Sequence, residues 1–249
     1  MEVHHHPHVE KKGFKEYFLE FLMIFLAVTL GFFAETLRER ISEHRLVREY
    51  ARSLVKDLRE DSSQLNVYIK YYGNAANNVD TLLQVLATKD PKEVPTGKLY
   101  WYGLFGGSNA YFTPNDATLQ QIKSTGTLRY FSTQTAIAIA NYDRLCRNME
   151  TRQQDESRLY IEVRKSRAQI FEFKYNEMAN DIYQEEKKTL DRSKIDSFIQ
   201  SKPPLLTYDK ALFNEYSELM RSRFLHLKVQ AADTLLTNAG NLIRLLQSE

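Results

Sequence analysis

The chain is poor in helix-breaking residues, in cysteine and in excess charge of either sign. Only nine Gly and six Pro occur among its 249 residues, which favours long, uninterrupted elements. Cys146 is the single cysteine, so an internal disulfide is excluded. The 34 basic and 32 acidic residues are mixed along the same stretches and leave a net charge of +2. This mixture lacks the concentrated basic face of nucleic-acid-binding proteins, so we expect no nucleic-acid partner.

Sequence signatures of common catalytic sites are also missing. The chain contains no HExxH or GxSxG motif. The glycines at 103, 106 and 107 do not form a phosphate-binding loop, because no Lys-Ser/Thr pair follows them. No pair of carboxylates stands out from the many surface ones. We therefore expect a protein that is not an enzyme, although a site assembled from distant residues stays open.

What the chain does have is one long apolar run, YFLEFLMIFLAVTLGFFA, from Tyr17 to Ala34. A helix of this length spans roughly 27 Å, close to the bilayer core of about 30 Å. The run predicts a transmembrane helix at 17–35, preceded by a His-rich tail at 1–16 and followed by a helical soluble domain at 36–249. A cleaved signal peptide is the alternative. It is disfavoured because its charged region would be unusually long and no small-x-small cleavage site follows convincingly.

The charges around the run give two opposing indications of orientation. Lysines precede it, and arginines follow it (Lys11, Lys12, Lys15; Arg38, Arg40, Arg45, Arg48, Arg52). A simple count places the C-terminal domain in the cytoplasm. However, a basic cluster ahead of a single anchor more often stays inside, which places the tail in the cytoplasm and the domain outside.

Glu20 is the one carboxylate within the apolar run. The run from Phe21 to Ala34 alone would span only about 21 Å, too short for the bilayer. Glu20 is therefore expected at or just inside the membrane boundary, where a carboxylate is costly unless it is protonated, paired or in contact with another protein. It either contacts a partner helix or a neighbouring protomer, or it extends to the interface near Lys15 and Glu16.

The tail at 1–16 carries four histidines in five positions: His4, His5, His6 and His8. Neutral imidazole nitrogen suits Zn, Ni or Cu, so the cluster is a candidate metal site. Against this, structural zinc sites draw their ligands from separated positions on a folded frame. A solvated tail without a bound metal is the alternative, and in that case we expect no cofactor.

Apolar residues recur three or four positions apart through most of the chain beyond the run. The pattern predicts a long helix from Leu37 to a stop at Gly73-Asn74, a short one at 78–88, and a short one from 113 to a C-terminal cap at Gly126. Residues 128–131 lead into a further long helix, whose apolar stripe extends from Ile139 to Ile182 with Cys146 on its buried side. Its polar stretch at 150–158 is expected to be exposed, bent or paired through charges. A short helix at 191–201 and Pro203-Pro204 precede the last helix, which starts near Asp209. We expect an all-α fold: the membrane helix continuing into an elongated antiparallel bundle.

Aromatic side chains and glycines are concentrated between positions 100 and 112. The aromatic residues are Tyr100, Trp101, Tyr102, Phe105, Tyr111 and Phe112. They are expected on a loop that could line a ligand pocket or contact a partner protein. Alternatively, the rings anchor that loop over the helices.

Two stretches resemble a family of uncharacterised single-pass membrane proteins found in Bacteroidota. One is 2–39, with His4-His5-His6-Pro7-His8 and the run from Glu20-x-x-x-Ile24 to Glu35. The other is 112–142, with Leu119-x-x-Ile122-x-Ser124-x-Gly126-x-Leu128 and Tyr142. The resemblance implies a tail in the cytoplasm, an inner-membrane anchor and a periplasmic helical domain, and it implies no activity. The arginines after the anchor depart from the pattern of the commoner members.

Three functions are compatible with these features. The first is a non-enzymatic scaffold or accessory subunit of the inner membrane, which contacts the lipid bilayer and associates with itself or with membrane partners. The second is a membrane-anchored sensor that binds a ligand in the helical domain. The third is metal binding by the histidine cluster.

Overall fold

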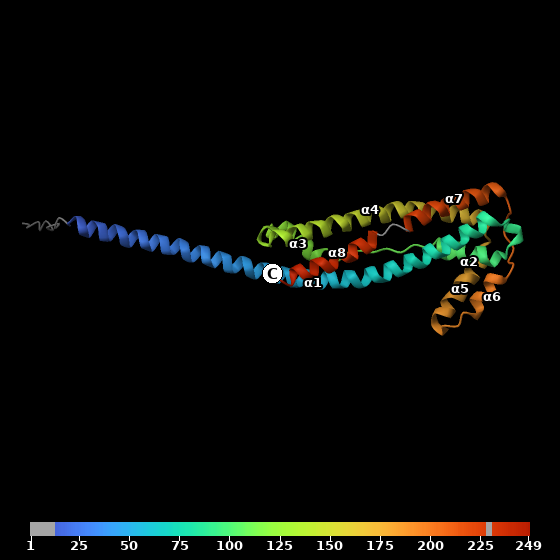
Figure 1. Ribbon diagram of the computed structural model, residues 1–249, viewed down its shortest axis with the longest axis horizontal. Coiled ribbons are helices and arrows are strands. Elements are labelled where there is room, and N and C mark those ends of the chain that lie inside the picture. The colour runs from blue at the N-terminus through green and yellow to red at the C-terminus, as the bar shows by residue number, and fades with distance from the viewer. Residues whose placement is uncertain (1–12, 228–230) are drawn as a thin grey trace, which may run out of the picture. The chain divides into compact units, whose positions relative to one another are not determined.

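The computed structural model describes residues 13–227 and 231–249, and in this part all regular secondary structure is helical (Figure 1). This confirms the all-α class. The α-helices are α1 (Phe14–Thr88), α2 (Thr96–Gly106), α3 (Ala117–Ser124), α4 (Thr133–Ile170), α5 (Phe173–Thr189), α6 (Ser193–Gln200), α7 (Lys210–Leu227) and α8 (Ala231–Leu246). The structure also has two 3-10 turns, η1 (Pro91–Glu93) and η2 (Thr127–Tyr130). An isolated antiparallel bridge joins Phe171 to Leu205.

The chain divides into two compact units, Met1–Tyr50 and Ala51–Glu249. The described part of the first unit consists of the N-terminal part of α1, which includes the apolar run. The second unit contains the rest of α1 and every later helix. The single long apolar helix followed by a helical domain agrees with the predicted architecture.

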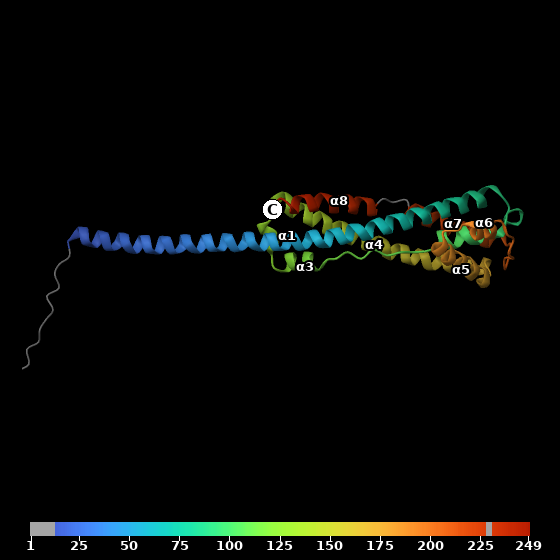
Figure 2. The ribbon, with the colours of Figure 1, turned by 90° about the horizontal axis from the view of Figure 1, so that it is seen from below.

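In the second unit, α4 packs against α7 and α8, and side-chain contacts give the directions of the helices. Arg223 of α7 contacts Glu156, and Glu249 after α8 accepts a hydrogen bond from the backbone N–H of Ser132, just before α4. As the residue number rises from 132 to 156 along α4, that of its partner falls from 249 to 223. The helices α7 and α8 therefore run antiparallel to α4. Asp61 contacts Tyr142 and Tyr72 lies beside Glu156, so α1 and α4 run parallel (Figures 1 and 2).

A parallel pair needs a connection that returns along the bundle, and residues 107–116 provide it. We call these residues the return segment. It leaves the C-terminal end of α2 and leads to α3, which precedes α4. Its contacts with α1 lead from the level of Tyr72, which binds Asn109, to that of Asp61, which binds Asn115. This segment therefore lies alongside helices on both sides.

The core of the second unit contains the apolar stripes that the sequence predicts. Leu54, Leu58, Leu65, Val79 and Leu82 of α1 are buried, as are Ile139 and Val163 of α4 and Phe213, Tyr216, Met220, Leu235 and Leu242 of the last two helices. Burying one such side chain stabilises the fold by roughly 1.5–3 kcal/mol.

The predicted stop at Gly73-Asn74 was wrong, because α1 continues through it to Thr88. A glycine inside a helix costs only about 1 kcal/mol relative to alanine. The apolar stripe continues on both sides of Gly73, where Tyr72, Ala75 and Val79 are buried. Their burial outweighs the cost of the glycine.

The aromatic residues 100–105 lie on a helix, α2, and not on the expected loop. The glycines of α2 allow neighbouring helices to approach its backbone closely, and they do not form a turn. A Cβ on Gly103 would lie 2.6 Å from the Tyr216 hydroxyl oxygen, and one on Gly106 would lie 2.9 Å from a methyl carbon of Val79. The glycines let α2 pack tightly against α1 and α7.

One predicted long helix is divided in the structure, and the last one is described in two parts. The helix expected to carry the stripe from Ile139 to Ile182 is interrupted at Phe171, whose backbone pairs with Leu205, so α4 and α5 are separate. The last helix is described as α7 and α8. It starts as predicted, because the Asp209 carboxylate accepts hydrogen bonds from the N–H groups of Ala211 and Leu212. The cap at Gly126 is also confirmed, since this residue has a left-handed φ of 67°.

Candidate functional site

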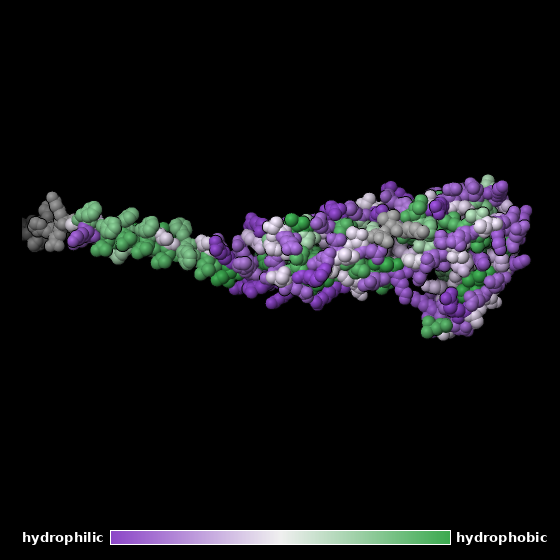
Figure 3. All heavy atoms as spheres, viewed as in Figure 1, coloured by the Kyte–Doolittle hydropathy of each residue, from purple (hydrophilic) through white to green (hydrophobic). Residues whose placement is uncertain are grey.

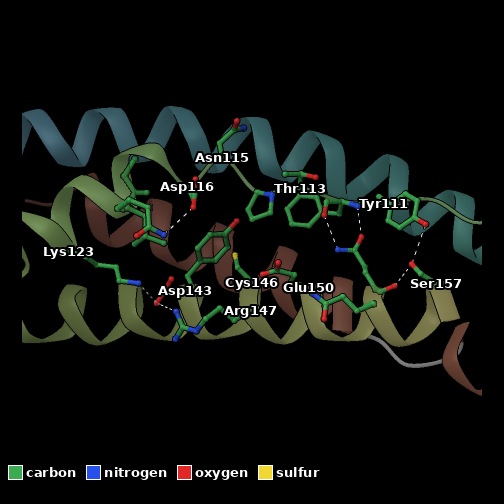
Figure 4. A pocket seen from close by; sticks show the side chains of 18 residues that line it. Tyr111, Thr113, Asn115, Asp116, Lys123, Asp143, Cys146, Arg147, Glu150 and Ser157 are labelled. Carbon is green, nitrogen blue, oxygen red and sulfur yellow. Dashed lines mark hydrogen bonds and ion pairs between the residues drawn. The ribbon is translucent and has the colours of Figure 1, made fainter.

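A groove of about 650 Å³ lies between α4, α3 and the return segment (Figure 4). Leu54 of α1, Leu119 of α3 and Tyr142 of α4 form part of its lining and are buried. Polar side chains complete the walls: Thr113, Asn115, Asp116, Gln120, Gln153, Gln154 and Ser157. Its volume is within the range of small-molecule sites.

Asp61 of α1 is buried beside Tyr142 and Asn115, two residues that line the groove. Its carboxylate accepts hydrogen bonds from the Tyr142 hydroxyl at 2.7 Å and from the Asn115 backbone N–H at 2.8 Å and side-chain amide at 3.2 Å. Burial raises the pKa of Asp61, although these hydrogen bonds partly oppose the shift. The carboxylate thus joins three elements, α1, α4 and the end of the return segment.

Cys146 lines the groove one helical turn beyond Tyr142 (Figure 4). It is buried, as the sequence predicts, and burial raises the pKa of its thiol to about 12. The thiolate is the nucleophilic form of cysteine, so at neutral pH this side chain packs as a small apolar group. Burial also raises the pKa of the Tyr142 hydroxyl. Both side chains are therefore suited to packing and hydrogen bonding in their protonated forms.

One end of the groove carries a cluster of three charges. The Asp143 carboxylate accepts hydrogen bonds from the Lys123 ammonium at 3.1 Å and from the Arg147 guanidinium (Figure 4). Burial opposes ionisation of Asp143, but the two cations outweigh it and lower the pKa of this carboxyl group. The cluster joins α3 to α4 and carries a net positive charge.

Side chains of the neighbouring helices form hydrogen bonds with the return segment. The Gln153 side chain accepts a hydrogen bond from the Phe112 N–H at 2.6 Å and donates one to the Phe112 carbonyl at 2.9 Å. The Tyr72 hydroxyl donates to the Asn109 side chain at 2.7 Å and to the Ala110 carbonyl at 3.1 Å. The wall of the groove is thus fixed to both α1 and α4.

A buried ion pair fixes the start of the same segment. Arg223 of α7 is fully buried and donates to Glu156 at 2.9 Å, to the Gly106 carbonyl at 2.8 Å and to the Ser108 carbonyl. The polar stretch at 150–158 is therefore partly paired through charges, one of the interpretations left open by the sequence.

The structure separates the six predicted aromatic site residues. Tyr111 and Phe112 line the groove. Tyr100 is buried, accepts a hydrogen bond from the Glu172 N–H and donates one to the Pro204 carbonyl. It therefore joins α2 to the chain at Glu172 and at Pro204. Trp101 and Phe105 line a separate hollow of about 350 Å³, and Tyr102 lines neither.

The other predicted sites lie outside this groove. Glu20 is on α1 in the first unit. His4, His5, His6 and His8 lie outside the described residues, and their metal binding stays a prediction. Within residues 13–227 and 231–249, no group of three His, Cys, Asp or Glu residues is arranged to hold a metal ion.

Sequence reasoning missed Asp61, Glu156 and Arg223. A signal existed for Asp61, because it occupies the stripe position between Leu58 and Leu65 where an apolar residue is expected. An acidic residue at a core position indicates a buried partner. The partners of Asp61 are 54 and 81 positions away, and no local pattern identifies residues at such separations.

Comparison with known proteins adds no relative: no family model, curated protein or solved structure matches this chain. The resemblance to the Bacteroidota family stays a prediction from the sequence.

Proposed function

We propose that the chain is a non-enzymatic scaffold or accessory subunit of the inner membrane, anchored by α1 and associated with itself or with membrane partners. One observation carries this proposal. No part of the most apolar 18-residue window of α1 is buried within the described protein. Between Tyr17 and Phe33, the large exposed apolar side chains are 48% to 73% exposed (Figure 3).

Water is an unfavourable environment for this surface. A dozen such side chains favour an apolar environment by roughly 20 kcal/mol or more in total. The helix also satisfies its own backbone hydrogen bonds, as a membrane span must. A lipid bilayer matches both the length and the composition of the segment.

Membrane extraction tests the anchor. The native chain should stay in the membrane pellet after carbonate washing, whereas L22R combined with L26R should move into the soluble fraction. Q64R with V67R is the matched control, because it adds the same two arginines at exposed positions of the same helix beyond the apolar run. Release of the native chain by carbonate would contradict the anchor.

The scaffold role predicts a defined complex. Gentle detergent extraction followed by mass determination of the intact assembly should give a stoichiometric partner or a fixed number of copies. We propose that Glu20 contributes to this association through a polar contact with a neighbouring helix. E20Q should weaken the complex, and E39Q, beyond the apolar run, should not. A bare monomer from native membranes would overturn the scaffold proposal.

A second candidate function is ligand sensing, which the groove favours. Q120W or Q154W would fill the groove from opposite walls, whereas Q121W places the same ring on an exposed position of α3 that does not line it. A small molecule that copurifies with the native chain and with Q121W, but not with the other two variants, would support sensing. A native chain without any bound molecule would leave scaffolding as the only supported role.

A further inference from the structure

A second large hollow lies at the opposite end of α1 from its apolar run. It has a volume of about 740 Å³ and lies between the last turns of α1, η1 and the first half of α7. All its lining residues are in the second unit. None of them lines the groove described above.

The lining of this hollow is apolar where the two helices face each other. Leu83, Leu86 and Ala87 share one face of α1, because they are three and four positions apart. From the other side come Phe213, which is buried, and Tyr208 just before α7. These five side chains contribute to the apolar part of the lining, and Asn214 and Ser217 of α7 add polar groups beside them.

The rim of the hollow is mainly cationic. Lys89 and Lys92 approach from the end of α1 and from η1, and Lys210 and Arg221 from α7. None of these four takes part in an ion pair within the part of the chain that the structure describes. The guanidinium carbon of Arg221 also lies 5.9 Å from the centroid of the Phe224 ring.

Two acidic residues, Asp90 and Glu218, also line the hollow. The Asp90 carboxylate already accepts a hydrogen bond from the Lys92 N–H at 2.9 Å and caps η1. Four cations therefore face two carboxylates, one of which is engaged in a local turn. The charged residues of the lining therefore give an excess of two positive charges beside its apolar side chains.

We propose that this hollow binds an amphiphilic organic anion: a carboxylate or phosphate head group with an unbranched apolar chain. The head group would be bound by the cations of the rim, for which Arg and Lys are suited. The chain would lie against Leu83, Leu86 and Phe213. The volume lies within the range of small-ligand pockets. The proposal does not depend on the scaffold role.

Binding can be measured by calorimetry on the full chain in phosphatidylcholine nanodiscs, with empty nanodiscs subtracted. The probes are decanoate, decyl phosphate, decyltrimethylammonium and inorganic phosphate. The first two should bind saturably with one site per chain. The cationic probe has the same chain length and should bind at least tenfold more weakly, as should phosphate, which lacks the chain. Equal binding of the cationic probe would overturn the proposal.

Charge-reversal variants locate the site. K210E with R221E should weaken decanoate binding at least tenfold. K187E with K188E is the matched control, because it makes the same change of charge at exposed positions of α5 that do not line the hollow. Trp101 fluorescence reports whether each variant is folded, since the only tryptophan is buried in the second unit. Unchanged affinity in a folded K210E/R221E variant would overturn the proposal.

The head group could belong to a membrane lipid or to a free molecule. Repeating the decanoate titration in nanodiscs that contain phosphatidylglycerol distinguishes the two sources. A weaker apparent affinity there, absent in K210E/R221E, identifies the lipid as a competitor for the same site. An unchanged affinity identifies a free anion as the ligand. Either result supports the site, provided that the two variants differ as stated.

Discussion

At the scale of single residues, buried charged side chains connect separate elements of the bundle. Arg223 and Glu156 are both buried, and Arg223 also satisfies two backbone carbonyls. A buried ion pair adds little net stability compared with apolar residues, but removal of one partner leaves an uncompensated charge and costs about 3–5 kcal/mol. Such a pair makes the position of α7 against α4 and the return segment specific.

E156Q should therefore lower the free energy of unfolding by about 3 kcal/mol or more. The change keeps the shape of the side chain and removes its charge, so the loss reports the buried Arg223 guanidinium. Urea unfolding of the full chain, followed by Trp101 fluorescence, measures it. The control E162Q removes an exposed carboxylate from the same helix, paired only with Lys165 at the surface, and should change stability by less than about 0.5 kcal/mol. Similar losses in both variants would contradict the role assigned to the pair.

The raised pKa of Asp61 predicts how the free energy of unfolding changes with pH. Its pKa is raised on folding, mainly by burial, so the folded chain binds this proton more tightly than the unfolded one. Stability should then fall as pH rises from the ordinary value near 3.8 to the raised value, and level off above it. D61N should remove this part of the decline.

The slope of unfolding free energy against pH, rather than its absolute value, is the measurement for Asp61, because D61N also changes hydrogen bonds. D143N provides a contrast of opposite sign. The pKa of Asp143 is lowered, so its stabilising contribution is present above pH 3.8 and is lost as pH falls below it. An unchanged slope in D61N would show that Asp61 does not titrate in this window.

At the scale of the elements, the sequence predicts the helices well where periodicity is strong and their ends where a capping residue is present. Asp209 and Gly126 mark their helix boundaries as expected. The errors arose where tertiary packing overrides local signals. Gly73 is accommodated because the stripe on either side of it is buried, and Phe171 ends a helix because its backbone pairs with Leu205, 34 positions later.

The groove was predictable only in part for the same reason. Tyr111 and Phe112 were chosen for their aromatic rings, and they do line it. The residues that shape the groove, Asp61 and Gln153, act through bonds to backbone groups more than 40 positions away. The spacing of residues in a sequence contains no information on such contacts.

The return segment should depend on Gln153 for its order. Q153M removes both hydrogen bonds to Phe112 while keeping an unbranched side chain, which should cost about 1–2 kcal/mol locally. Amide hydrogen exchange at Phe112 should become roughly tenfold or more faster, since 1.4 kcal/mol corresponds to a factor of ten. Q154M changes the adjacent groove residue, whereas both side-chain hydrogen bonds described for the Phe112 backbone go to Gln153, and it should leave that exchange rate unchanged. Equal exchange in both variants would assign the order of the segment to other contacts.

At the scale of the whole molecule, the proposed anchor would place the tail and the helical domain on opposite sides of a membrane. The lysines before the apolar run and the arginines after it favour opposite orientations. We propose that the tail is cytoplasmic and the helical domain periplasmic. The single cysteine makes this testable, because Cys146 is buried and can be replaced to give a background without thiols.

In a C146A background, K188C places a thiol on an exposed position of α5, and E2C places one in the tail. A membrane-impermeant maleimide added to spheroplasts should label K188C and leave E2C unlabelled. Inverted membrane vesicles should give the reverse pattern, which excludes a difference in intrinsic reactivity. The opposite pattern in both preparations would place the domain in the cytoplasm. It would then show that the arginines after the anchor, rather than the lysines before it, determine the orientation.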